Sequence, residues 1–173
     1  MPLMISVVAT LCFQTAVHGV YAFNYFKFLA VDADRQAFLT RNVNGYAAVP
    51  WVNANLKKTD LVFIDQRQLK YPLQVPTFFG SPKMQSAIDL RPDKTDARKL
   101  YRQLRSVGIT HLLIDQNKNG AYAYPLNLLD GAGCITRLKR FNRPNVLSRT
   151  LPSLSSDRKV QDLLRLKDEA CLR

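Results

Sequence analysis

The 173-residue sequence has no charged residue before Lys27, although it holds 25 Lys and Arg and 13 Asp and Glu in total. It has three cysteines, too few for a small scaffold held together by many disulfides. With two histidines and scattered acids, a His-rich metal site is not expected. The seven glycines are too dispersed to form a phosphate-binding loop. These shortages argue against a disulfide-rich scaffold, a histidine-rich metal site and a glycine-rich phosphate loop. The lack of charge before Lys27 also marks one boundary in the chain.

The rest of the composition is typical of a globular protein. Hydrophobic residues make up 47% of the chain and charged residues 22%, and the formal net charge is +12. The length fits one domain and is sufficient to bury a core without cross-links. We therefore expect an uncharged segment, residues 1–26, followed by one soluble domain, residues 27–173.

The uncharged segment has the length of a membrane span. A helix over residues 3–23 would be about 31 Å long at ~1.5 Å per residue, close to the ~30 Å hydrocarbon core of a bilayer. This predicts a single transmembrane anchor helix. Two alternatives are a cleavable signal peptide that ends near residues 20–22, although no basic residue precedes its apolar part, and a core or interfacial helix.

The expected anchor carries a polar stripe. Thr10, Gln14 and His18 are spaced four residues apart and share one helical face, which Tyr21 and Tyr25 extend. Polar side chains that face lipid are costly, so the stripe predicts docking on a partner helix; alternatively, the polar groups reach headgroup water. His18 has the chemistry to ligate a haem or chlorophyll metal. A lone intramembrane histidine is more often only hydrogen-bonded, so no cofactor is expected.

Helix and strand patterns alternate in residues 27–173 and predict a small, three-layer-like α/β domain with a partly parallel sheet. The clearest helix is 94–107, with Asp93 or Thr95 as its cap and Gly108 after its end. A buried strand at 109–114 follows it directly, as in a βαβ unit, whose strands are parallel. The other expected helices are 32–43, 46–56, 126–129 and 157–170, and the other strands are 61–64, 75–79 at an edge, and a hairpin of 135–141 with 146–151.

Few residues indicate chemistry. Asp65 and Asp115 each follow an apolar strand, and ligands of open parallel sheets bind beyond the carboxyl ends of the strands. The pair is therefore a candidate ligand site, although an aspartate in this position also commonly starts a turn. His111 is expected to pack or to bond the backbone rather than to act as a base. No nucleophile–base set and no metal-ligand spacing is present, so the sequence predicts neither an enzyme nor a metal site.

A basic stretch without any acid spans residues 137–149 and contains Arg137, Lys139, Arg140, Arg143 and Arg149. Strand alternation would put Arg137 and Lys139 on one face and Arg140 on the other. Such a patch suits anionic lipid headgroups or an acidic protein partner, and a solvated surface is the third interpretation. Nucleic acid is a poor fit to a membrane-anchored chain.

Five short segments resemble a known family: FNYFK at 23–27, DRQAFL at 34–39, WVNA at 51–54, GITHLL at 108–113 and SRTL at 148–151. Together they resemble the end of bacterial GT-C class glycosyltransferases, the dolichyl-phosphate-mannose-protein mannosyltransferase-like group, over residues 5–150. The resemblance implies a last membrane helix followed by a small extracytoplasmic α/β domain. The catalytic carboxylate of that family lies in a multi-helix membrane region that this sequence lacks, so no catalytic residue is transferred.

Two arguments disagree about the side of the membrane. The basic residues that follow the anchor place the domain in the cytoplasm by the positive-inside rule, whereas the resemblance implies the periplasmic face of a bacterial inner membrane. A disulfide between Cys134 and Cys171 would fit the periplasm, and two buried thiols are the alternative. The sequence thus predicts a non-catalytic, single-pass accessory subunit that docks on a larger membrane protein complex. The alternative is a detached domain that assists lipid-linked sugar transfer by a separate glycosyltransferase.

Overall fold

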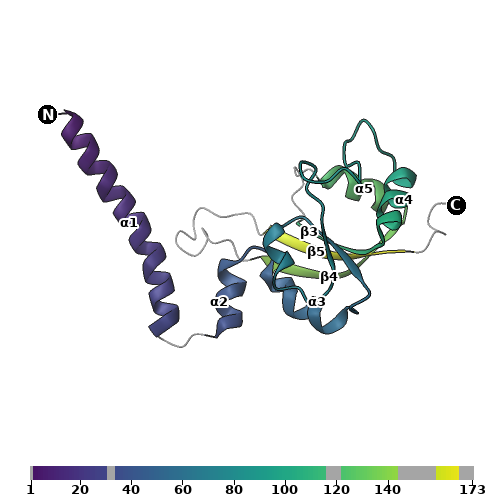
Figure 1. The fold of residues 1–173 in the computed structure, drawn as a ribbon, viewed down its shortest axis with the longest axis horizontal. Coiled ribbons are helices and arrows are strands. Elements are labelled where there is room, and N and C mark those ends of the chain that lie inside the picture. The colour runs from purple at the N-terminus through teal and green to yellow at the C-terminus, as the bar shows by residue number, and fades with distance from the viewer. Residues whose placement is uncertain (1, 31–33, 116–121, 144–158, 168–173) are drawn as a thin grey trace. The chain divides into compact units, whose positions relative to one another are not determined.

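The computed structural model describes residues 2–30, 34–115, 122–143 and 159–167 (Figure 1). The chain divides into two compact units, Met1–Leu39 and Thr40–Arg173. The first unit contains the helix α1, Pro2–Ala30, and α2, Arg35–Asn42, runs across the boundary between the units. The second unit contains the sheet and the remaining helices.

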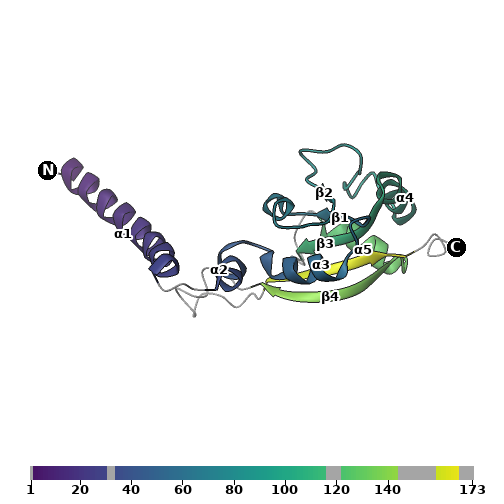
Figure 2. The same ribbon diagram turned by 60° about the horizontal axis from the view of Figure 1, so that its bottom comes forward.

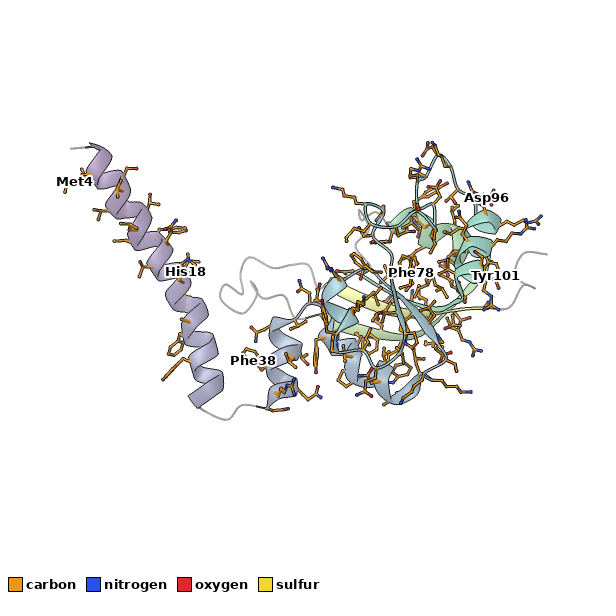
Figure 3. The ribbon with its side chains drawn as sticks, viewed as in Figure 1. Met4, His18, Phe38, Phe78, Asp96 and Tyr101 are labelled. Carbon is orange, nitrogen blue, oxygen red and sulfur yellow. The ribbon has the colours of Figure 1, made fainter. Side chains whose placement is uncertain are left out.

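The helix α1 is continuous and presents large apolar side chains to its surroundings. Met4, Phe13 and Phe23 are each more than two-thirds exposed, and Figure 3 shows the side chains that project along this helix. Thr10 donates its hydroxyl proton to the carbonyl of Ser6 at 2.8 Å, so its polar group is satisfied within the helix. Within the ranges that the structure describes, no helix combines the length and the apolar character needed to cross a bilayer.

The second unit is an α/β fold around a mixed five-stranded sheet with the order β2-β1-β3-β5-β4. The strand β1 pairs in parallel with β2 and β3, whereas β5 pairs antiparallel with β3 and β4. The partly parallel sheet is therefore confirmed, and the short β2 lies at an edge, as its proline predicted. The strands are β1 Leu61–Ile64, β2 Thr77–Phe79, β3 Ile109–Asp115, β4 Ile135–Arg143 and β5 Lys159–Leu166.

Helices cover both faces of the sheet (Figure 2). On one face, α4 (Ala97–Val107) and α5 (Ala123–Gly131) pack over the main core, to which Phe63, Leu112 and Leu164 contribute. On the other face lie the 3-10 turns η1 (Tyr46–Ala48) and η2 (Arg67–Lys70) and the helix α3 (Val49–Asn55), which begins near a proline. Burial of strand side chains on both faces fixes the position of the sheet between these helices.

The apolar spacing correctly predicted α4, although its start lies three residues later than expected. The cap is Asp96, which accepts a hydrogen bond from the backbone N–H of Lys99 at 2.7 Å, so the assignment to Asp93 or Thr95 was wrong. Gly108 ends the helix at φ 89°, a left-handed conformation that favours glycine. The chain then enters β3 directly, in parallel with β1, as the βαβ pattern predicted.

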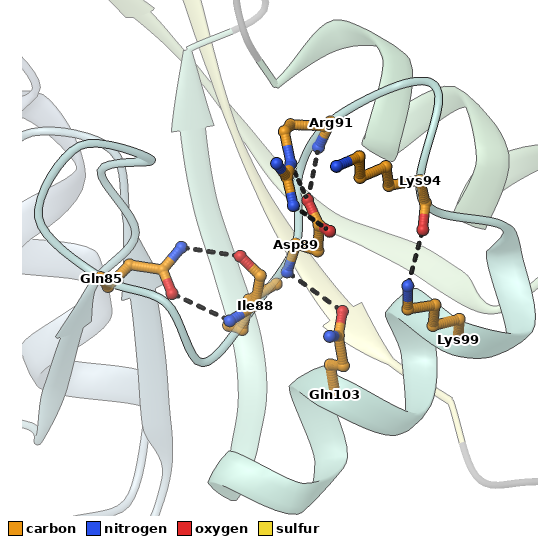
Figure 4. Close-up of polar contacts among 7 residues, drawn as sticks. All are labelled: Gln85, Ile88, Asp89, Arg91, Lys94, Lys99 and Gln103. Atoms are coloured by element: carbon orange, nitrogen blue, oxygen red, sulfur yellow. Dashed lines mark hydrogen bonds and ion pairs between the residues drawn. The ribbon is translucent and has the colours of Figure 1, made fainter.

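Polar contacts order the irregular segment between β2 and α4 (Figure 4). The side-chain amide of Gln85 bonds both the backbone N–H and the carbonyl of Ile88, each at 2.9 Å. The N–H of Asp89 donates to Gln103 of α4 at 3.1 Å, and the Asp89 carboxylate binds Arg91 through two contacts of 2.8 Å. The Arg91 guanidinium lowers the pKa of Asp89. These bonds attach the segment to α4 without regular secondary structure.

The end of the chain differs from its prediction. The expected final helix at 157–170 is wrong, because residues 159–166 form the strand β5 between β3 and β4. The apolar positions Val160, Leu163, Leu164 and Leu166 fit helical spacing, but neighbours on both sides hold this segment extended. The first strand of the expected hairpin is present as β4, which pairs with β5, whereas its second strand, residues 146–151, lies outside the described ranges.

Candidate functional site

The structure brings together the two aspartates that the sequence singled out. Asp65 directly follows β1 and Asp115 is the last residue of β3, and these two strands are parallel neighbours. The backbone N–H of Asp115 donates to Oδ2 of Asp65 at 2.8 Å. The carboxyl ends of the two strands are therefore joined by a charge-assisted hydrogen bond.

The connections around these ends leave in opposite directions. After β1 the chain continues through η2. The buried Leu69 of η2 lies close to Gly45, which directly precedes η1, so η2 lies on the α3 side of the sheet. After β3 it reaches α5, whose Leu126 and Leu129 belong to the core on the α4 side. Adjacent parallel strands whose connections diverge in this way form a topological switch point, where open α/β sheets place their ligands.

A tyrosine that the sequence analysis did not single out completes this edge. The Tyr122 hydroxyl donates to the carbonyl of Gly80, which follows β2, at 3.2 Å. Burial, with a smaller contribution from the charge of Asp65, raises the pKa of Tyr122 to about 12. Gly80 lies so close to the Phe63 ring that a side chain there would overlap the ring. Tyr122 was difficult to find because its neighbours in space are far from it in sequence.

The described groups at this carboxyl edge, Asp65, Asp115 and Tyr122, are hydrogen-bonding groups, whereas the histidine of β3 lies nearer the opposite end of that strand. His111 is buried within β3, with Nδ1 2.8 Å from the hydroxyl of Thr110, which itself donates to the Leu61 carbonyl. Burial lowers the pKa of His111. Among the described residues no group of three or more His, Cys, Asp or Glu could hold a metal ion. The edge is suited to bind hydroxyl or amide groups.

A small cavity in the main core does not add a ligand site. It has a volume of about 20 Å³ and is lined by apolar side chains of the sheet, α4 and α5, with Tyr122 at its border. Such a volume is close to that needed for one water molecule, and an apolar lining leaves a cavity of this size dry.

The basic stretch does not form one patch. Arg137 and Arg140 both contact Asp162, whereas Lys139 lies on the other face, with Nζ 5.3 Å from the Trp51 ring centroid. The prediction that Arg137 and Lys139 share a face is wrong, because a β-bulge between them inserts one extra residue. Arg143 lies opposite Lys159 in the strand register, and Arg149 lies outside the described residues.

Lys139 belongs to a cation–aromatic cluster on the α3 side. The rings of Trp51 and Phe141 meet edge to face with centroids 6.2 Å apart, and Lys139 Nζ is 6.0 Å from the Phe141 centroid. Trp51 comes from α3 and the other two residues from β4. The cluster attaches α3 to the outermost strand of the sheet, which is a structural use of this cation.

The polar stripe lies on a regular helix. Thr10, Gln14 and His18 recur every four residues of α1, and their side chains are exposed. Tyr21 and Tyr25 fall on the same face by their positions in the helix. The exposed apolar side chains occupy the rest of the circumference, at positions 4, 5, 8, 13, 20 and 23 among others.

One of the two cysteines considered for a disulfide is cross-linked. Cys134 is disulfide-bonded and fully buried directly before β4, whereas Cys12 on α1 is free and exposed. Cys171, the partner considered from the sequence, lies outside the described residues. A buried disulfide is typical of proteins that fold in an oxidising compartment.

The comparisons with known proteins contribute no family. No protein-family model matches the chain, and no curated protein or solved structure is significantly similar to it.

Proposed function

We propose that this protein is a non-catalytic accessory subunit that docks through α1 on an integral membrane protein complex. The observation that carries the proposal is the surface of α1. Its apolar side chains are exposed around most of the helix, and residues 1–26 contain no charge. A helix that is apolar around most of its circumference needs an apolar environment to cover it.

The polar stripe identifies the face of α1 that contacts the partner helix in this proposal. Gln14 and His18 have no hydrogen-bond partner within the described part of the chain, whereas Thr10 bonds its own helix. In an apolar environment an unpartnered amide or imidazole is costly, so these two side chains supply bonds to a partner helix. The single-pass insertion expected from the sequence remains part of this proposal, and it rests on the uncharged stretch.

The disulfide at Cys134 supports a domain on the periplasmic side of a bacterial inner membrane. The positive-inside rule argues for the opposite orientation, because Lys27, Arg35 and Arg41 follow the uncharged segment and no basic residue precedes it. Docking on a partner with a fixed topology is able to override such a small charge bias.

The test is co-purification from membranes in mild detergent, with native sizing and mass spectrometry of the bound proteins. The double variant Gln14→Leu/His18→Leu should separate from its complex, since it loses both polar contacts. The matched control Cys12→Leu/Thr15→Leu changes two uncharged residues on other faces of α1 and should remain bound. Equal retention of both double variants, or a lone 19.7 kDa chain in the wild-type preparation, would contradict the proposal.

A second candidate function is assistance to lipid-linked sugar transfer by a separate glycosyltransferase. The observation that favours it is the Asp65–Asp115 pair at the switch point, because carboxylates and backbone groups are suited to bind sugar hydroxyls. Saturable binding of a polyprenyl-phosphate sugar, weakened by Asp65→Asn but not by the exposed control Asp130→Asn, would support it. Absence of any such binding would exclude it.

A further inference from the structure

Two arginines of β4 converge on one buried carboxylate of β5. Asp162 is fully buried, and its Oδ1 and Oδ2 accept from Nε and Nη2 of Arg140 at 2.9 and 3.0 Å. Nε of Arg137 lies 2.8 Å from Oδ2 of the same carboxylate. The neighbouring strand thus holds both guanidinium groups in place, so little side-chain entropy remains to be lost on binding a further group.

The β-bulge is what makes this convergence feasible. Residues three apart on a regular strand point to opposite faces, so Arg137 and Arg140 would be separated by the sheet. The extra residue at the bulge, between Arg137 and Lys139, brings the two arginines to the same face. Bulges commonly redirect a side chain toward a binding site.

The cluster retains unused charge and unused donors. Two guanidinium groups and one carboxylate leave one net positive charge, and the side chains of Arg137 and Arg140 are 52% and 49% exposed. Within the described residues, neither Nη atom of Arg137 nor Nη1 of Arg140 has a partner. The buried side of the cluster is satisfied, while its exposed side offers several N–H donors from two planar groups.

We propose that Arg137 and Arg140 form a binding site for a phosphoryl group, with Asp162 as the residue that positions them. Each guanidinium presents paired donors that match two oxygens of a phosphate, and a phosphate has enough oxygens to serve both groups at once. A single carboxylate, with two oxygens, is matched by one guanidinium alone. The proposal does not depend on docking through α1. The phosphoryl group belongs either to free phosphate or to a lipid headgroup.

The test is calorimetric titration of the full chain in an uncharged detergent with two probes. One probe is inorganic phosphate and the other is a short-chain phosphatidylglycerol below its micelle concentration. Binding of inorganic phosphate would identify the free anion as sufficient, whereas binding of the lipid alone would identify the headgroup. Absence of binding of both probes to the wild-type chain would overturn the proposal and leave the cluster as an internal ion pair.

Three variants separate a specific site from general basicity. Arg137→Lys keeps the charge but loses the planar donor pair, and it should weaken binding by roughly tenfold, the scale of a lost charge-assisted hydrogen bond. Arg137→Gln/Arg140→Gln/Asp162→Asn removes the site without leaving a buried charge and should abolish binding. Lys139→Gln removes one charge from the opposite face and should bind like the wild type. A loss of affinity for the probes in Lys139→Gln that equals the loss in Arg137→Lys would overturn the proposal. If the triple variant does not fold, the comparison of Arg137→Lys with the wild type decides between the two interpretations.

Discussion

The backbone N–H of Asp115 donates to the carboxylate of Asp65 at 2.8 Å, across two parallel strands that are 50 residues apart in the chain. This bond joins the ends of β1 and β3 at the switch point of the sheet. It is also the residue pair that the sequence analysis selected. Its contribution to folding can be measured independently of any ligand.

Replacement of Asp65 should therefore reduce stability. Asp65→Ala leaves the Asp115 N–H without this acceptor, and we expect a loss of about 1–3 kcal/mol in the free energy of unfolding. Asp65→Asn keeps an acceptor oxygen and should cost less. Chemical denaturation of both variants checks the prediction, and equal losses would show that charge rather than hydrogen bonding matters at this position.

Gly80 should not accept a side chain. In Gly80→Ala the new methyl group would overlap the Phe63 ring, and such overpacking costs about 1–3 kcal/mol. Gly131→Ala is the matched control, because Gly131 lies at the end of α5 with open space around it. The control should change the melting temperature little. A neutral Gly80→Ala would mean that the contact between Gly80 and the Phe63 ring is not as close as described.

His111 should make stability depend on pH. Burial lowers its pKa from 6.5; Asp60 opposes this shift and Arg165, its partner across the strand pair, adds to it. The unfolded chain then binds the proton first, so this contribution to stability is complete above about pH 6.5 and is lost as the pH falls below it. In His111→Gln, denaturation midpoints between pH 7 and 5 should fall less steeply than in the wild type. Parallel curves for the two proteins would contradict the assignment.

The disulfide at Cys134 should contribute strongly to stability. Removing a native disulfide from a small domain typically costs about 2–5 kcal/mol, so Cys134→Ser should lower the melting temperature by several degrees. Cys12→Ser removes an exposed free thiol and should have no such effect. Peptide mapping without reductant identifies the partner cysteine. A melting temperature unchanged by reductant would remove the support that Cys134 gives to a periplasmic location.

The sequence predicted those parts of the fold whose local and long-range preferences agree. In α4 the apolar spacing, the acidic cap and Gly108 all favour the same helix, and β1 and β3 are short apolar runs that are buried whichever strand they pair with. The strand β5 was mistaken for a helix because its apolar positions also fit helical spacing. Its extended state depends on pairing with β3 and β4, which no local pattern reveals.

The candidate site residues divide in the same way, into those with a local sequence signal and those placed only by tertiary contacts. Asp65 and Asp115 could be found because each marks the end of an apolar strand, and parallel strands end at the same edge. Tyr122 and Asp162 could not, because they reach their neighbours only through tertiary packing. The bulge in β4 also had no local signal, although it decides which basic residues share a face.

The same bulge affects how the sheet ends. The outer strands of the described sheet are β2, with three residues, and β4, with nine. A long outer strand exposes unpaired backbone groups, which another chain can extend into an aggregated sheet. In β4 the extra residue interrupts the regular spacing of these groups, and Arg137, Lys139 and Arg140 surround the interruption with positive charge. Within the described sheet this edge is therefore a poorer template for another copy of the chain than a regular strand of the same length would be.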